Sequence, residues 1–300
     1  MAIGDVYDAE ECPDVHYVDT GMYDVPEYGS VYLIDAERPA LVDTGIGTRY
    51  GNILDMMAEA GVDPEDLGVI ALTHVHLDHA GGAGYLVEEC PNATVYVHEI
   101  GAPHLADPTR LWEGTKQAVG DQVQYYAEPK PVPEDRIVEL TDGDEITLGD
   151  HTLKAHHAPG HAPHQVVFSD PAIDGVFVAD AAGLYTPSTD EVHVTSPPVN
   201  FDLDRALADI ETIRDLDPET LLYGHFGTEQ TGDRLDEYAE KLDAWVTAVR
   251  EKRAELADDE AVVRHFVETV ETPDVWGEHK AREEVALNVR GVLVMLDRAD

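Results

Sequence analysis

The stretch THVHLDHAGG, residues 73–82, places three histidines and one aspartate within six consecutive positions. It overlaps the end of the apolar run GVIALT, residues 68–73, which predicts a buried β-strand. His74 and His76 are two residues apart, so on a straight strand they would point to opposite faces. They can converge on one ion only where the chain has left the strand, and we therefore expect both histidines in a loop.

The second half of the stretch predicts a junction between this loop and a helix. Asp78 and His79 lie at the junction, where Gly81 and Gly82 permit a close backbone approach and unusual dihedral angles. Imidazole and carboxylate donors together suit zinc or a related divalent ion. A solvated histidine-rich loop is the simpler alternative, since the chain has 15 histidines. The His-x-His-x-Asp-His spacing directly after a strand favours the metal site.

The stretch HVHLDHAGG resembles the motif of the metallo-β-lactamase superfamily, and four further motifs follow the family's order. The resemblance covers roughly residues 14–228. It implies an α/β fold, a four-layer αββα sandwich of two β-sheets flanked by helices. The four further motifs are LVDTG with Asp43, HHAPGHAPHQ with His161, VFVADAAG with Asp180 and LLYGHFG with His225.

The resemblance also implies two divalent metal ions, most simply Zn²⁺, with Fe or Mn as alternatives. Asp43 would orient a ligand or the loop without binding metal. His76 occupies the position at which iron-binding members of the superfamily carry a glutamate, which disfavours a redox site. The implied ligands are His74, His76 and His161 for the first ion, Asp78, His79 and His225 for the second, and Asp180 as a bridge between them.

The implied activity is hydrolysis. Two divalent ions lower the pKa of a water held between them from about 15.7 toward neutrality. A metal-bridged hydroxide would then attack a small-molecule thioester, ester or lactone, while Asp78 orients it and accepts its proton. A thiolate leaves with little help from an acid, because the pKa of a free thiol is about 8.5. Two alternatives stay open: a phosphodiesterase or ribonuclease, and an inert binding protein that the metal stabilises.

Three tyrosines are candidate substrate contacts. Tyr23 and Tyr28 lie in GMYDVPEYGS, which occupies the position of the family's flap, and Tyr185 follows Asp180 closely. The segment 101–133 fits neither helical nor strand periodicity throughout, and we expect a partly helical insertion at the rim of the site. Its aromatic residues either line an apolar entrance or pack the insertion itself: Trp112, Tyr125 and Tyr126.

The chain becomes helical after its strand-rich part, so we divide it into residues 1–228 and a C-terminal helical region, 229–300. In placement this region resembles the helical domain of glyoxalase II-type thioesterases. The Arg-x-x-Lys pair with which that family holds glutathione is absent. The nearest basic cluster is Arg250, Lys252 and Arg253.

Charge is the unusual feature of the composition. The chain has 19 Lys and Arg against 62 Asp and Glu, a net charge of −43, and the acidic residues are dispersed. Such dispersed acid is typical of proteins from salt-loving archaea, because at about 1 M salt the Debye length falls to roughly 3 Å. A surface this negative disfavours nucleic acid, which needs Lys and Arg patches. We therefore expect a small-molecule substrate, and the oligomeric state stays open.

The remaining features predict a soluble cytoplasmic protein. The two cysteines, Cys12 and Cys90, are expected to be free thiols in a reducing compartment. The first residues lack the pattern of a signal peptide. No run approaches the ~18 consecutive apolar residues of a membrane span.

Overall fold

The computed structural model describes residues 2–10 and 12–299, and within them one sheet has seven strands in sequential order. Strands β1 to β4 pair antiparallel, and β4 to β7 pair parallel. The parallel half requires crossovers, which carry helices in the chain between β4 and β6. The strands are Val6–Asp8 (β1), Val15–Asp19 (β2), Ser30–Ile34 (β3), Ala40–Val42 (β4), Val69–Ala71 (β5), Thr94–His98 (β6) and Ile137–Leu140 (β7).

A second sheet of the described chain has six strands in the order β15-β14-β11-β10-β9-β8. All its pairs are antiparallel except β11 with β14. A separate hairpin joins β12 (Leu184–Thr186) to β13 (Glu191–His193). The strands of the sheet are Glu145–Thr147 (β8), Thr152–His157 (β9), Val166–Asp170 (β10), Gly175–Ala179 (β11), Thr220–Tyr223 (β14) and Gly227–Gln230 (β15).

The two sheets pack face to face on one apolar core. Tyr32 of β3, Phe168 of β10 and Phe177 of β11 are almost completely buried in it. Burying an aromatic or aliphatic side chain of this kind contributes about 1.5–3 kcal/mol each. The Tyr32 hydroxyl donates to the carbonyl oxygens of Tyr223 and Gly227, which satisfies its polar group inside the core.

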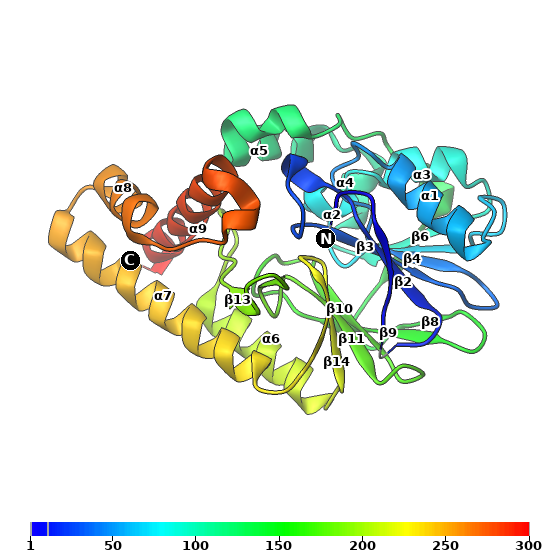
Figure 1. The fold of residues 1–300 in the computed structure, drawn as a ribbon. Coiled ribbons are helices and arrows are strands. Elements are labelled where there is room, and N and C mark those ends of the chain that lie inside the picture. The colour runs from blue at the N-terminus through cyan, green and yellow to red at the C-terminus, as the bar shows by residue number, and fades with distance from the viewer. Residues whose placement is uncertain (1, 11, 300) are drawn as a thin grey trace.

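Helices cover the outer face of each sheet, which completes four layers (Figure 1). Ile53, Met56 and Met57 of α1 pack on the first sheet, as does α3. Ile210 and Ile213 of α6 pack on the second sheet together with the C-terminal helices. The αββα sandwich expected from the sequence is confirmed. These helices are Gly51–Ala60 (α1), Leu77–Ala80 (α2), Ala83–Glu89 (α3) and Leu203–Asp215 (α6).

The C-terminal helices share the core of α6 and the second sheet. They are Arg234–Leu256 (α7), Asp259–Thr269 (α8) and Gly277–Ala299 (α9), with the short 3-10 helix Asp274–Trp276 (η4) before α9. The apolar spacing of the sequence predicts a last helix from about Arg282, whereas α9 begins at Gly277. The domain boundary after residue 228 stays a prediction.

The segment 101–133 is partly helical, as expected. It contains Ala102–Ala106 (α4), Thr109–Val119 (α5) and the 3-10 helix Gly120–Tyr125 (η2). Figure 1 shows α5 next to the upper end of α9. Two more 3-10 helices are Met22–Asp24 (η1) and Glu134–Arg136 (η3).

The structure corrects some predictions about local structure and confirms others. Strands β1, β12, β13 and β15 were not expected, because they are short and only partly apolar. Gly81 and Gly82 have ordinary φ values of −61° and −84°, so unusual dihedral angles are not their role. A Cβ at Gly82 would lie 2.3 Å from the carbonyl oxygen of Thr44, which confirms the close backbone approach. Both cysteines are buried, and neither forms a disulfide.

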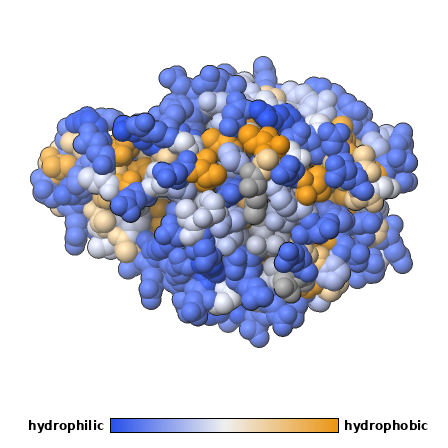
Figure 2. Space-filling model, viewed as in Figure 1, coloured by the Kyte–Doolittle hydropathy of each residue, from blue (hydrophilic) through white to orange (hydrophobic). Residues whose placement is uncertain are grey.

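The surface is mostly hydrophilic on the face that Figure 2 shows, with hydrophobic residues in small patches. Among the described residues, no helix combines the length and the apolar character that crossing a membrane requires.

Candidate metal centre

Strand direction brings the histidines and aspartates together. Strands β9, β11 and β14 run the same way in the second sheet, so their carboxyl ends meet at one edge. His161 follows β9, Asp180 follows β11 and His225 follows β14. His74 and His76 lie beyond the end of β5 in the facing sheet, in a loop as expected. The site therefore sits where the edges of both sheets meet.

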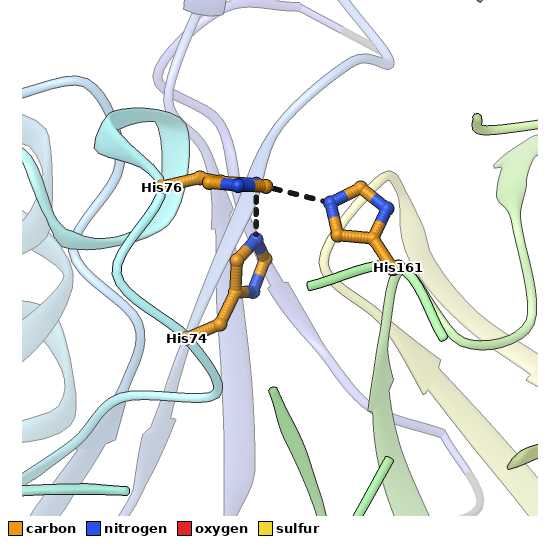
Figure 3. Close-up of side chains that lie close together, drawn as sticks. All are labelled: His74, His76 and His161. Carbon is orange, nitrogen blue, oxygen red and sulfur yellow. Dashed lines mark hydrogen bonds between the residues drawn. The ribbon is translucent and has the colours of Figure 1, made fainter. Parts of the chain in front are cut away.

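The first group of side chains is His74, His76 and His161. Nδ1 of His76 lies 3.1 Å from Nε2 of His74 and 3.0 Å from Nε2 of His161. The three rings point toward one another from two different loops (Figure 3). Their nitrogen atoms all lie within 4.8 Å of one another, which is the spacing of ligands around one ion.

The second group is Asp78, His79 and His225. Asp78 and His79 lie in α2, directly after the loop, as the sequence predicted. Nε2 of His225 is 3.1 Å from Nε2 of His79 and 3.9 Å from Oδ2 of Asp78. The ligand atoms of this group again lie within 4.8 Å of one another.

Asp180 lies between the two groups. Its Oδ2 is 3.3 Å from Nε2 of His74 and of His161 and 3.2 Å from Nε2 of His79. Its Oδ1 is 3.5 Å from Nε2 of His225. One carboxylate thus contacts both groups, which is the geometry that the bridging role requires.

Hydrogen bonds outside the centre determine which imidazole nitrogen faces it. The Thr73 hydroxyl donates to Asp43, so its oxygen accepts from Nδ1 of His74 at 3.2 Å. The carbonyl oxygen of Tyr28 accepts from Nδ1 of His225 at 2.6 Å. In their neutral forms both histidines therefore present the Nε2 lone pair to the centre. Converging lone pairs beside a carboxylate are the donor set that a divalent cation needs, so the residues present fit metal ions.

Asp43 contacts both His79 and the loop that carries His74 and His76. Its Oδ2 accepts from Nδ1 of His79 at 2.8 Å, and its Oδ1 accepts from the backbone N–H of Thr73 at 2.9 Å. Asp43 has a φ of 64°, a left-handed conformation that aspartate tolerates better than most residues. A Cβ at Gly224 would lie 2.9 Å from Cε1 of His79, so glycine leaves room for this ring. Thr73 was not singled out in the sequence, although it directly precedes His74.

Burial and neighbouring charges shift the pKa values of the centre in opposite directions. Burial lowers the pKa of His161 to about 4 and that of His74 well below its ordinary value, which favours the neutral rings that a metal ion requires. Burial also opposes charge on His79, but Asp180 and Asp43 raise its pKa well above the ordinary value. A metal ion bound at Nε2 of His79 therefore has to displace a proton.

A pocket opens over the centre. It encloses about 650 Å³ of empty space, its mouth included, and Asp78, His76 and Asp180 lie at its floor. Tyr23 and Tyr28 line its wall, as expected for substrate contacts.

The insertion and the C-terminal helix complete this wall. Thr115 and Val119 of α5, Tyr126 after η2, and Glu284 and Leu287 of α9 line the pocket. None of the described lining residues is a lysine or arginine. Trp112 and Tyr125 pack against the neighbouring apolar cluster instead of lining the pocket.

Tyr185 lies apart from the pocket. Its hydroxyl donates to Glu229 at 2.7 Å and is 3.1 Å from Asp190, and its ring contacts Arg234. The hydroxyl therefore does not line the pocket, although the backbone N–H of Tyr185 donates to the carbonyl oxygen of His225 at 2.5 Å. The basic cluster Arg250, Lys252 and Arg253 is also absent from the pocket wall.

Two histidines near His161 support the loops. Nδ1 of His164 accepts from the backbone N–H of Val75 at 3.4 Å, and Val75 lies between His74 and His76 in the sequence. His157 contacts the carbonyl oxygen of Pro163 at 2.9 Å and stacks on His98. Neither belongs to the sets of converging ligand atoms.

Three residues of α9 near the pocket were not found by sequence reasoning. Lys280, Glu284 and Asn288 are spaced by four residues and almost completely buried. The available signal was a polar stripe along a helix that is otherwise apolar on its inner face.

Comparison with known proteins agrees with this geometry. The sequence profile of the metallo-beta-lactamase superfamily matches residues 24–225. A metallo-beta-lactamase fold-containing protein of Sulfurisphaera tokodaii, ST1585, is 26% identical over 222 residues, 72% of this chain and 79% of its own. An acyl-coenzyme A thioesterase of Gallus gallus, MBLAC2, is 27% identical over 55% of this chain and 65% of its own, slightly less than two thirds. An N-acyl homoserine lactonase of a Bacillus species is 25% identical over 68% of this chain and 83% of its own.

Solved structures share the fold. The crystal structure of ST1585 from Sulfolobus tokodaii superposes with a TM-score of 0.72 at 24% identity, covering 94% of this chain and 99% of the other. TTHA1429 of Thermus thermophilus, a metallo-beta-lactamase family protein, gives 0.62 at 22% identity, covering 90% and 89%. The matched profile includes Asp43 and every proposed ligand, from His74 to His225, and of the two sheets it leaves out only β1, β2 and β15. This chain belongs to the metallo-beta-lactamase superfamily.

Proposed function

We propose that this protein is a two-metal hydrolase that cleaves the thioester, ester or lactone bond of a small molecule. The observation that carries the proposal is the position of Asp180. Its two carboxylate oxygens lie within 3.5 Å of histidines from both ligand groups, so one carboxylate can bridge two ions.

The ligand assignment follows from the two groups. Donors of nitrogen and oxygen only, without thiolate, suit Zn²⁺ and also accommodate iron or manganese. Bound ions supply an activated water nucleophile and polarise the carbonyl oxygen of the substrate. The proposed ligands are His74, His76 and His161 for one ion, Asp78, His79 and His225 for the other, and Asp180 for both.

The chain itself supplies a proton acceptor. The Asp78 side chain is 27% exposed and lies at the pocket floor, whereas the other carboxylate, Asp180, is 3% exposed. Burial would raise the pKa of Asp78, but His79 and His225 lower it below its ordinary value. Asp78 therefore stays ionised and can accept the proton of the nucleophile. The nucleophile adds to the carbonyl carbon, the C–S or C–O bond breaks, and the thiolate or alkoxide leaves with its electron pair.

The pocket wall supports an uncharged acyl group beside the reacting carbonyl. Tyr23, Tyr28, Tyr126 and Leu287 offer aromatic and aliphatic surface. The wall has no lysine or arginine among the described residues to hold a phosphodiester, and the chain carries a net charge of −43. Relatives named a thioesterase and a lactonase are in line with acyl substrates.

One substrate panel tests the proposal. The metal-loaded protein is assayed in molar KCl with acyl thioesters, lactones, a phosphodiester and a chromogenic β-lactam. We expect thioester or lactone turnover that chelator abolishes and added metal restores. Asp78→Asn removes the proton acceptor at nearly constant shape and should lower kcat by about 100-fold or more. Glu278→Gln, on the exposed side of α9, is the matched control.

Other outcomes select the alternatives. Turnover of the phosphodiester alone would reverse the proposal in favour of a phosphodiesterase or ribonuclease. Two tightly bound ions without turnover of any substrate would favour an inert, metal-stabilised binding protein.

We also propose that the net charge of −43 adapts the protein to a salt-rich cytoplasm. Repulsion between dispersed carboxylates is screened at about 1 M salt, where the Debye length is roughly 3 Å, but not in dilute buffer. Circular dichroism on lowering the KCl concentration should show loss of tertiary packing. Full thermal stability in dilute buffer would contradict this proposal.

A further inference from the structure

Helix α9 carries a buried ion pair that faces the metal pocket. Lys280 and Glu284 are 4% and 7% exposed, and Nζ of Lys280 donates to Oε2 of Glu284 at 2.7 Å. The ammonium group also lies over the rings of Tyr23 and Tyr28, at 4.0 and 4.2 Å from their centroids. A charge buried this deeply is costly unless hydrogen bonds and opposite charge compensate it, as they do here.

The carboxylate of Glu284 is held at both oxygens. Oε1 accepts from Nδ2 of Asn288 at 2.9 Å, one turn further along α9. Oε2 accepts from the hydroxyl of Tyr28 at 2.6 Å as well as from Lys280. Asn288 is fixed in turn by the backbone N–H of Ser196, which donates to its Oδ1 at 2.5 Å. Glu284 is thus a rigid acceptor aimed at Tyr28.

Tyr28 connects this carboxylate to a proposed metal ligand. Its carbonyl oxygen accepts from Nδ1 of His225 at 2.6 Å, and its ring lies 5.1 Å from the ring of His225 in an edge-on arrangement. Its ring also packs on Trp276, whose indole N–H donates to the carbonyl oxygen of Glu27. Tyr28 is therefore held by α9 at its hydroxyl and holds His225 at its carbonyl.

We propose that Lys280 and Glu284 are positioning residues of the metal centre, acting through Tyr28 on His225. The inference rests on the proposed two-metal function. On this proposal, α9 orients one ligand of the second ion, although the helix lies far from the metal-binding motifs in the sequence. The first group, His74, His76 and His161, has no described contact with this ion pair.

A purely stabilising role explains the arrangement less well. The cost of removing two charges from water often exceeds their attraction, so replacing a buried ion pair by apolar side chains is frequently neutral or stabilising. The hydroxyl of Tyr28 needs an acceptor at one defined place, and Glu284 supplies it. Directional contact with Tyr28 is what an apolar pair would lose.

Two variants test the proposal. Tyr28→Phe removes only the hydroxyl and keeps the ring and the backbone carbonyl. The double variant Lys280→Met, Glu284→Met replaces the ion pair by apolar side chains of similar length, which avoids leaving one buried charge alone. Chelator competition with Zn²⁺ then measures the affinity of each ion directly, and thermal melting verifies folding.

We expect both variants to lower the affinity of the protein for one ion by about 10- to 100-fold, the usual effect of losing a group that orients a ligand. The other ion should change by less than about threefold. Combining Tyr28→Phe with the double variant should add little further, because all three residues act in one chain of contacts. In a His225→Ala background, Tyr28→Phe should leave the affinity of the remaining ion unchanged.

Glu278→Gln is the control, because it breaks the exposed Glu278–Arg282 pair of the same helix and spacing. Unchanged affinities, equal weakening of both ions, or additive losses would overturn the inference. A wild-type protein that binds fewer than two ions would instead contradict the proposed function. The two failures are therefore distinguishable in one titration series.

Discussion

The two ligand groups differ in what holds them. Three of the seven proposed ligands, His74, His76 and His161, belong to two loops at strand ends. These loops are supported by Thr73 and by Asp209 in the middle of α6. His79 and His225 of the second group are held by Asp43 and by the carbonyl of Tyr28, from two other segments. Both groups thus need tertiary contacts, but only the second is linked through Tyr28 to the C-terminal helix α9.

Asp180 is the residue common to both groups, and its loss should have the largest effect. Asp180→Ala removes the carboxylate within 3.5 Å of four histidines. Both ions should bind poorly, and turnover should fall by at least the roughly 100-fold expected for Asp78→Asn, because the metal-activated nucleophile is lost with the ions. Metal analysis after desalting measures the ion content. Retention of two ions would show that the groups are independent of this bridge.

Single-ligand variants compare the groups directly. His225→Ala and His161→Ala each remove one imidazole from a different group, so each should lower the metal content from about two ions per chain to about one. The two variants should also differ in their affinity for the ion that remains, which chelator competition measures. A wild-type content of one ion, unaltered by His225→Ala, would exclude the second group as a metal site.

Asp43→Asn tests the support of the second group. The amide cannot carry the negative charge that faces Nδ1–H of His79, although its oxygen can still accept one hydrogen bond. We expect metal affinity to fall by about 10- to 100-fold, as for other partners of metal-bound histidines. Chelator competition should locate the loss in the ion bound by His79. An equal loss at both ions would mean that Asp43 acts mainly through the shared loop at Thr73.

Asp209 tests the support of the first group, with a smaller effect. Its carboxylate accepts from the backbone N–H of Gly160 at 2.6 Å, next to His161. Burial raises the pKa of Asp209 to about 7 in the folded chain, above its ordinary value of 3.8. The folded state thus binds the carboxyl proton of Asp209 more tightly than the unfolded state does. The stability that this proton contributes is present below about pH 4 and is lost as the pH rises through about 7.

Asp209→Asn keeps the shape and an acceptor oxygen but cannot ionise. The melting temperature of the wild type should therefore fall relative to the variant between about pH 4 and about pH 7, and the difference should level off above that range. Thermal melts of both proteins at equal salt measure the difference. Parallel curves would show that Asp209 does not titrate in this range.

The αββα architecture was implied by the resemblance of the five motifs to the metallo-β-lactamase superfamily, and the longer strands were predictable because they carry strong local patterns. The runs that became β3, β6, β10 and β11 are rich in valine, isoleucine and aromatic residues and are bounded by turn residues. Short strands such as β12 and β15 have no such pattern, since their pairing partners provide most of their stability. The start of α9 was missed for a related reason: it follows a 3-10 turn that the apolar periodicity does not mark.

The candidate site divides along the same line. Histidines and aspartates crowded at strand ends are visible in the sequence, because parallel strand direction brings such ends together. Tyr185 shows the limit, since proximity to Asp180 in sequence did not bring its hydroxyl to the pocket. Lys280 and Glu284 were not found from the sequence. They belong to a helix more than fifty residues after the last proposed ligand, and this helix supplies part of the pocket wall.

The sequence by itself determined the fold class, through the resemblance of its motifs to a known superfamily. It also determined the types of candidate metal-binding residue and their loops, because these follow from donor chemistry directly after predicted strands. Only the tertiary structure decided which nitrogen of each histidine faces the centre, which tyrosines line the pocket, and that α9 contacts Tyr28. These features depend on side-chain contacts between segments far apart in the chain. Local periodicity carries no information about such contacts.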